Sequence, residues 1–155
     1  MPLAGPRSAA VLGTPIGHSL SPVLHRAAYA ALGLAGWTYD AIECDESRLA
    51  DLLAGTGPEL AGYSATMPLK RAVLRVAAQV SPQARAIGAG NTLLPHAEGW
   101  YVDNTDWIGI RDALAAHAVP ATGDVLLLGA GGTAQAALAA LTGARSVTAL
   151  VREPA

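Results

Sequence analysis

The sequence of 155 residues has one cysteine, no phenylalanine and no long apolar run. The single cysteine, Cys44, excludes a disulfide framework within the chain, and we expect it to be a small buried apolar residue. No apolar run reaches the ~18 residues that a membrane-spanning helix needs. Residues 1–7 also lack the charged start and apolar core of a signal peptide. These absences predict a soluble cytoplasmic protein with no membrane partner.

Charged side chains are scarce as well, at 14% of the sequence against 52% hydrophobic residues, and the net charge is −2. The absence of a basic run argues against nucleic acid as the main partner. His18 and His25 have no cysteine or carboxylate at the spacing of metal ligands, so we expect no metal site. The hydrophobic share argues against disorder, and the length suits one ordinary domain or two small lobes.

Lysine is the rarest positive charge: Lys and Arg total 10 residues, and Lys70 is the only lysine. An ammonium group can give up its proton near neutral pH when it is partly desolvated, whereas a guanidinium cannot. Lys70 is therefore a candidate catalytic acid/base, and an ordinary surface lysine is the alternative. Thr66 and Pro68 precede it at a predicted strand-to-helix junction, where sites of α/β proteins are usually built.

Strands and helices alternate in the predicted secondary structure. Strands are expected at 9–13, 37–43 and 60–65, and helices at 23–32, 47–54 and 68–80. A hairpin over 94–102, with its turn at 98–99, and a helix over 108–117 follow. This alternation predicts a parallel α/β layer.

Two serines precede the first predicted helix. Ser21 is a good N-cap, with Pro22 at the first helical position. Ser19 and Ser21 could both present hydroxyls to a ligand beside the free N–H groups of the helix. From these residues alone, the simpler interpretation is that Ser21 caps the helix and Ser19 belongs to the loop.

The two asparagines, Asn91 and Asn104, each precede a threonine. The segment Asn104-Thr105-Asp106 could serve only as a helix cap. Convergence of both pairs on one polar pocket is the favoured interpretation, because a polyhydroxylated ligand needs amide, hydroxyl and carboxylate partners. Asp106 is also a candidate to orient Lys70.

After a linker at 118–123, the sequence predicts a fully buried strand at 124–128, a helix at 135–141 and a second strand at 146–151. Gly129, Gly131 and Ala134 fit the glycine-rich fingerprint of dinucleotide-binding folds between the first strand and the helix. Arg152, at the end of the second strand, suits the 2′-phosphate of NADP, while the adjacent Glu153 leaves NAD open.

Five separated stretches together resemble the shikimate dehydrogenase family. They are Gly17–Pro22, Thr66–Lys70, Gly90–Thr92, Asn104–Asp106 and Gly129–Gly132, and their order and spacing match over nearly the whole chain. The resemblance implies a shikimate-binding catalytic α/β domain at residues 1–118. It implies the first part of a Rossmann NADP-binding domain at residues 119–155, with the active site between the two.

The resemblance also assigns roles to residues. It implies catalysis by Lys70 with Asp106 as its partner. The implied substrate-binding residues are Ser19, Ser21, Thr66, Lys70, Asn91 and Asp106. The implied cofactor-binding residues are Gly129, Ala130, Gly131, Gly132, Thr133 and Arg152. The implied activity is the NADP-dependent, reversible reduction of 3-dehydroshikimate to shikimate in aromatic amino acid biosynthesis, by a monomer or homodimer.

The chain departs from the family pattern in three places. Ser64-Ala65-Thr66 stands where the family usually reads Asn-Val-Thr, and Val151-Arg152-Glu153 stands where it reads Asn-Arg-Thr. Family members also continue well past residue 155, so we expect a truncated form. The alternatives are a catalytically impaired fragment that still binds shikimate and an NAD-dependent quinate/shikimate dehydrogenase. A generic dinucleotide-binding module is disfavoured, because it leaves Lys70 and both Asn-Thr pairs unexplained.

Overall fold

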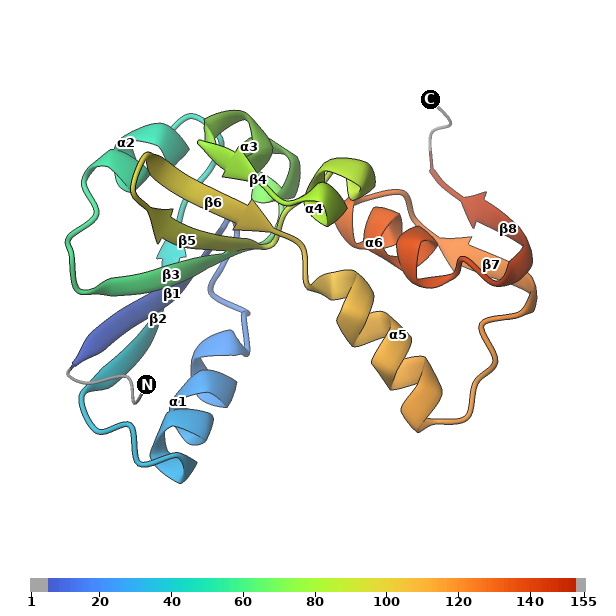
Figure 1. The fold of residues 1–155 in the computed structure, drawn as a ribbon, viewed down its shortest axis with the longest axis horizontal. Coiled ribbons are helices and arrows are strands. Elements are labelled where there is room, and N and C mark those ends of the chain that lie inside the picture. The colour runs from blue at the N-terminus through green and yellow to red at the C-terminus, as the bar shows by residue number, and fades with distance from the viewer. Residues whose placement is uncertain (1–5, 153–155) are drawn as a thin grey trace.

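The computed structural model describes residues 6–152 and shows two lobes, each built around a β-sheet (Figure 1). The larger lobe contains a six-stranded sheet of order β2-β1-β3-β5-β6-β4, and the smaller lobe contains the two strands β7 and β8. The predicted α/β class is confirmed. No helix within residues 6–152 is both long enough and apolar enough to cross a bilayer.

The elements occur in the following places along the chain. The strands are β1 (Arg7–Gly13), β2 (Trp37–Glu43), β3 (Leu60–Ala65), β4 (Gln79–Val80), β5 (Thr92–His96), β6 (Gly99–Asp103), β7 (Gly123–Leu128) and β8 (Ala144–Leu150). The helices are α1 (Ser21–Ala31), α2 (Leu49–Ala54), α3 (Leu69–Val76), α4 (Pro82–Ile87), α5 (Asp106–Ala116) and α6 (Gly132–Ala140).

The strand β1 lies between β2 and β3 and pairs in parallel with both, as the alternation of elements predicts. Beyond β3 the sheet is mixed, because β5 runs antiparallel to both of its neighbours, β3 and β6. Parallel strands end at the same edge of a sheet, so the segments that follow β1, β2 and β3 lie beside one another. This edge carries the polar residues described below.

The main core lies between the larger sheet and the helices α2 and α3, while α1 covers the opposite face (Figure 1). Leu12, Leu49, Leu69 and Leu93 are almost completely buried in this core. Cys44 is buried with them, which confirms its predicted role as a small apolar residue. Burial raises the pKa of its thiol.

Two helix predictions need correction. The helix predicted at 68–80 ends at Val76, because Ala77 is extended and Gln79–Val80 pairs with β6 as the short strand β4. Ser21 is not an N-cap: α1 begins at Ser21 itself, and the Oγ of Ser19 accepts a hydrogen bond from its backbone N–H at 3.3 Å. The upstream hydroxyl therefore supports the start of this helix.

The strand predicted to be fully buried, β7, is only half covered. Its residues alternate between partly buried and exposed, and Leu126 and Leu128 are 63% and 76% exposed. Within the described residues, α6 packs on one face of this sheet, so alternate side chains of β7 stay in contact with solvent. The unit β7–α6–β8 has parallel strands, which is the repeating βαβ unit of a Rossmann fold.

The helix α5 leads from the larger sheet towards the smaller lobe and packs against α6 (Figure 1). Ile87, Ala89 and Ala136 form a small buried cluster where α4 meets α6, with Trp107 and Ile110 of α5 packed against it. This cluster holds the glycine-rich start of α6 close to the larger lobe. A domain boundary after residue 118 remains a prediction.

Candidate functional site

The segment from Thr66 to Lys70 leaves the end of β3 and enters α3 at the edge where the parallel strands end. The backbone N–H of Thr66 donates to the carbonyl of Leu12 in β1 at 2.9 Å. Gly13 permits a very close approach, because a Cβ there would lie 2.6 Å from Thr66 Cγ2 and 2.7 Å from the Met67 carbonyl oxygen. Thr66 is thus fixed by backbone contacts beside Lys70.

Lys70 lies in the first turn of α3, and its ammonium contacts two separate parts of the chain. Nζ donates to Asp106 Oδ2 at 2.5 Å and to Thr133 Oγ1 at 2.9 Å. The side chains of Lys70 and Asp106 are only 16% and 21% exposed. The structure therefore brings the single lysine and the predicted carboxylate partner together in a largely desolvated ion pair.

Both asparagines also meet at Asp106, but in different ways. Asn91 Nδ2 donates to Asp106 Oδ1 at 2.7 Å, and its Oδ1 accepts from the backbone N–H of Thr105 at 2.9 Å. Asn104 is 1% exposed, donates to the carbonyl of Ala89 at 2.8 Å and accepts from the backbone N–H of Asp106 at 3.0 Å. Asn91 thus belongs to the polar cluster, whereas Asn104 is the support beneath it.

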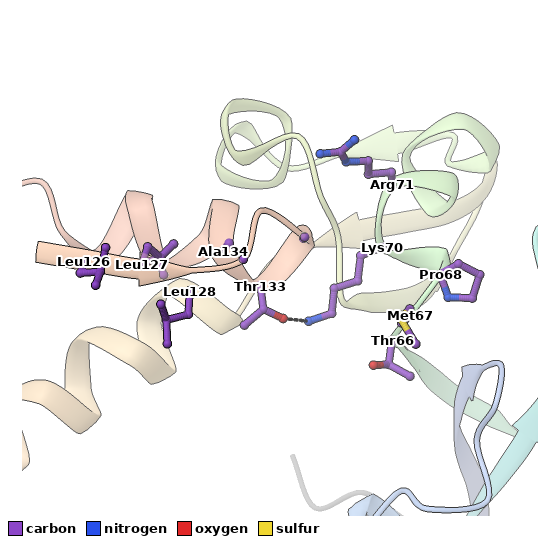
Figure 2. Close-up of a pocket in the computed structure, with 14 residues that line it drawn as sticks. Thr66, Met67, Pro68, Lys70, Arg71, Leu126, Leu127, Leu128, Thr133 and Ala134 are labelled. Carbon is purple, nitrogen blue, oxygen red and sulfur yellow. Dashed lines mark hydrogen bonds between the residues drawn. The ribbon is translucent and has the colours of Figure 1, made fainter. Parts of the chain in front are cut away.

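A pocket of about 650 Å³ lies between the two lobes beside this cluster. Figure 2 shows Lys70 between Thr66, Met67 and Pro68 on one side and the smaller lobe on the other. The full lining is Thr66, Met67, Pro68, Lys70, Arg71, Leu126, Leu127, Leu128, Gly129, Gly131, Gly132, Thr133, Ala134 and Ala137. The pocket therefore joins a polar end at Lys70 to an apolar wall on β7.

The residues of the glycine-rich turn line two pockets, and Gly129 and Gly131 belong to both. Gly129, Ala130 and Gly131 line a second pocket of about 670 Å³ together with Arg152 and its neighbours Leu150 and Val151. Gly129 has a φ of +107°, which an L side chain rarely adopts. A Cβ on Gly129 or Gly131 would meet no atom within 4 Å, so the backbone of this turn is open to a ligand.

Gly132 and Thr133, predicted with the same group, line the first pocket and contact Lys70. A Cβ on Gly132 would lie 3.0 Å from Lys70 Cβ and 3.1 Å from its Cδ. The contact between Thr133 and Lys70 was not expected from the sequence, since the two residues are 63 positions apart. Arg152 is exposed at the end of β8, and Glu153 lies outside the described residues.

The two serines precede or begin α1, and their place in the site remains a prediction. The hydroxyl of Ser19 accepts a hydrogen bond from the backbone N–H of Ser21, and within residues 6–152 neither serine side chain is hydrogen-bonded to Lys70. Ser64, which replaces the family's usual asparagine, accepts a hydrogen bond from the hydroxyl of Tyr39 at 2.7 Å. That position therefore serves packing within the larger lobe.

Sequence reasoning missed one polar contact at the same edge. The carboxylate of Glu43, at the end of β2, accepts hydrogen bonds from the Thr14 hydroxyl and from the backbone N–H of Ile16. These bonds lower the pKa of Glu43, the Thr14 bond contributing most. They hold the loop that leads to Ser19. The sequence signal that could have predicted this contact is a glutamate at the end of a strand parallel to β1.

Known proteins resemble the chain in both sequence and structure. The profile of the "Shikimate dehydrogenase substrate binding domain" matches residues 11–93. A pentafunctional AROM polypeptide of Candida tropicalis is 43% identical over 133 residues, which are 84% of this chain and 8% of that protein.

Two solved structures illustrate the likeness of fold. Shikimate dehydrogenase of Mycobacterium tuberculosis is 47% identical with a TM-score of 0.84, covering 96% of this chain and 56% of that one. Shikimate 5-dehydrogenase of Thermus thermophilus, solved in complex with NADP(H) and shikimate, is 39% identical with a TM-score of 0.87, covering 96% and 57%. This chain thus spans little more than half of the solved relatives and a small part of the AROM polypeptide. On the sequence match and the shared fold together, the chain belongs to the shikimate dehydrogenase family.

Proposed function

We propose that this chain carries the substrate site of an NADP-dependent shikimate dehydrogenase, which reversibly reduces 3-dehydroshikimate to shikimate in the cytoplasm. The observation that carries the proposal is the Lys70–Asp106 ion pair at 2.5 Å, beside a pocket between two lobes. The Thermus thermophilus relative was solved with NADP(H) and shikimate, which are the two ligands the proposal needs.

The polar groups near Lys70 suit a small acid with several hydroxyl groups. Thr66 lines the pocket, and the Asp106 carboxylate, which accepts a hydrogen bond from the Asn91 amide, offers acceptors beside it. Such a mixture matches the alternating donors and acceptors of vicinal hydroxyl groups. We assign Ser19 and Ser21 to the substrate carboxylate and a hydroxyl at the α1 end of the same site.

Lys70 is the proposed proton donor and acceptor. Its ammonium has three N–H bonds, of which two point to Asp106 and Thr133. The third is free to bond a substrate oxygen, to which Lys70 would give a proton during reduction and from which it would remove one during oxidation. Proton transfer by a positioned side chain typically accelerates a reaction about 10²–10⁴-fold. Asp106 fixes the direction of the ammonium.

The residues of the smaller lobe fit a dinucleotide. The open backbone at Gly129 and Gly131 and the free N–H groups at the start of α6 suit a pyrophosphate, and Arg152 suits a 2′-phosphate. When bound, NADP would supply the hydride chemistry. NAD is the less favoured alternative.

Replacing Lys70 by alanine tests the assignment. We expect turnover of shikimate with NADP⁺ to fall about 10²–10⁴-fold while shikimate still binds, because Asn91 and Thr66 remain in place. Lys70→Arg should fail similarly, since a guanidinium keeps its proton. Arg75→Ala, at an exposed ion pair on the same helix, is the matched control and should retain activity. Undiminished turnover in Lys70→Ala would refute the proposal.

One observation favours a second candidate, a chain that binds shikimate but turns over poorly. The described part of the smaller sheet has two strands, and Leu126 and Leu128 are largely exposed on its uncovered face. Shikimate binding by calorimetry, combined with NADP⁺ titration and a turnover assay on these 155 residues, separates the two. Binding of shikimate without turnover supports this second candidate. Parallel assays with NAD⁺ and with quinate test the remaining cofactor and substrate alternatives.

A further inference from the structure

The ammonium of Lys70 makes a polar contact between the two lobes. Nζ donates to Asp106 in the α5 segment. It also donates to Thr133 Oγ1, which lies in the first turn of α6 (Figure 2). The stem of the same side chain packs against Gly132, where a Cβ would come within 3.1 Å of two of its carbons. The glycine-rich turn therefore rests directly on the proposed catalytic lysine.

The electrostatic setting of this contact is unfavourable as it stands. The N-terminus of a helix carries a partial positive charge, which repels a cation placed beside it. The N-cap residue of α6 is Gly131, which has no side chain to bond the first N–H groups of the helix. Thr133 is the second residue of the helix. An anion near Thr133 would be attracted by the helix and by Lys70 together.

A threonine hydroxyl can accept one hydrogen bond and donate another at the same time. In the structure Thr133 Oγ1 accepts from Lys70, so its own proton is free to be donated. A phosphate oxygen at the Gly129–Gly132 turn could accept a hydrogen bond from that hydroxyl. This bond would complete a chain of hydrogen bonds from Lys70 through Thr133 to the phosphate. Such chains strengthen their individual bonds, because each bond polarises the next.

We propose that Thr133 is a positioning residue that couples binding of a dinucleotide phosphate at the glycine-rich turn to the orientation of the Lys70 ammonium. The inference rests on the proposed function, since it needs a dinucleotide as the second ligand. With the phosphate in place, the bond from Lys70 to Thr133 is polarised and the ammonium is held for the substrate. The proton donor is thereby fully ordered only when the cofactor is present.

The single lysine makes this coupling directly measurable. In protein labelled only with ¹³C-lysine, the Cε group beside the ammonium gives one NMR signal, that of Lys70. NADP⁺ is added without substrate, and binding is followed separately through the backbone amides of Gly129–Gly132. The variants are Thr133→Val, which removes the hydroxyl at nearly constant shape, Thr133→Ser, which keeps it, and Thr148→Val on β8 as the matched control.

We expect NADP⁺ to move the Lys70 Cε signal in the unchanged chain, in Thr133→Ser and in Thr148→Val, and to leave it in place in Thr133→Val. The inference is overturned, and the proposed function left standing, if the loop amides respond while the Lys70 signal does not. The inference is likewise overturned, and the proposed function left standing, if NADP⁺ moves the Lys70 signal of Thr133→Val as it does in the unchanged chain. If NADP⁺ moves neither set of signals, both the inference and the proposed cofactor are refuted.

Discussion

Replacing Asn104 by alanine tests how much the support beneath Asp106 contributes to the stability of the larger lobe. The side chain is 1% exposed, donates to the Ala89 carbonyl at 2.8 Å and accepts from the Asp106 backbone N–H at 3.0 Å. Each hydrogen bond is worth about 1 kcal/mol net, and leaving a buried group unpaired costs about 1–3 kcal/mol. The free energy of unfolding should therefore fall by roughly 3 kcal/mol.

Urea denaturation measures this loss as a lower midpoint with an unchanged slope. Asn91→Ala is the control, because Asn91 also bonds to Asp106 but is only partly buried, and it should cost about 1 kcal/mol. Asn104→Asp should be as damaging as the alanine variant, since it places a carboxylate oxygen against the Ala89 carbonyl. A loss below about 1 kcal/mol for Asn104→Ala would show that the buried amide is not a structural support.

Two further predictions concern the edge where the parallel strands end. Gly13→Ala should destabilise the chain by about 1–3 kcal/mol in the same urea assay, because the new methyl group would meet Thr66 and the Met67 carbonyl within 2.7 Å; an unchanged midpoint would contradict the close packing. The bond from Thr14 lowers the pKa of Glu43 below its ordinary 4.5. The stabilisation that the Glu43 carboxylate contributes is therefore fully present above the pKa of Glu43 in the unfolded chain. It is lost as the pH falls through the lower pKa of Glu43 in the folded chain. Glu43→Gln should show less acid destabilisation over that range, and an identical pH profile would refute the effect.

The sequence was sufficient to predict most elements of the larger lobe, because its strands and helices follow distinct periodicities bounded by Gly and Pro. The meeting of Lys70 and Asp106 also followed from general rules, since polar residues that leave strand ends gather at one edge. The burial of Asn104 did not, because an Asn-Thr-Asp segment before a helix has the same local pattern whether it is exposed or buried.

Features that depend on how the lobes sit together were beyond sequence reasoning. The run of apolar residues at 125–128 predicts burial on both faces, yet the exposure of Leu126 and Leu128 depends on which elements cover the sheet. The bond from Lys70 to Thr133 joins residues 63 positions apart in different lobes. No local sequence pattern predicts that these two side chains are close in space, because their separation is fixed by the packing of α6 against α4 and α5.

The small sheet of β7 and β8 has a consequence for how the molecule unfolds. Within residues 6–152 the smaller lobe has one helix packed on two strands and so buries much less apolar surface than the six-stranded sheet. Its opening therefore needs less free energy than global unfolding. Amide protons of β7 should then exchange through this partial opening, which detaches Thr133 while the ion pair of Lys70 and Asp106 stays formed. The proposed proton donor would thus outlast the loss of the lobe that is proposed to bind the nucleotide.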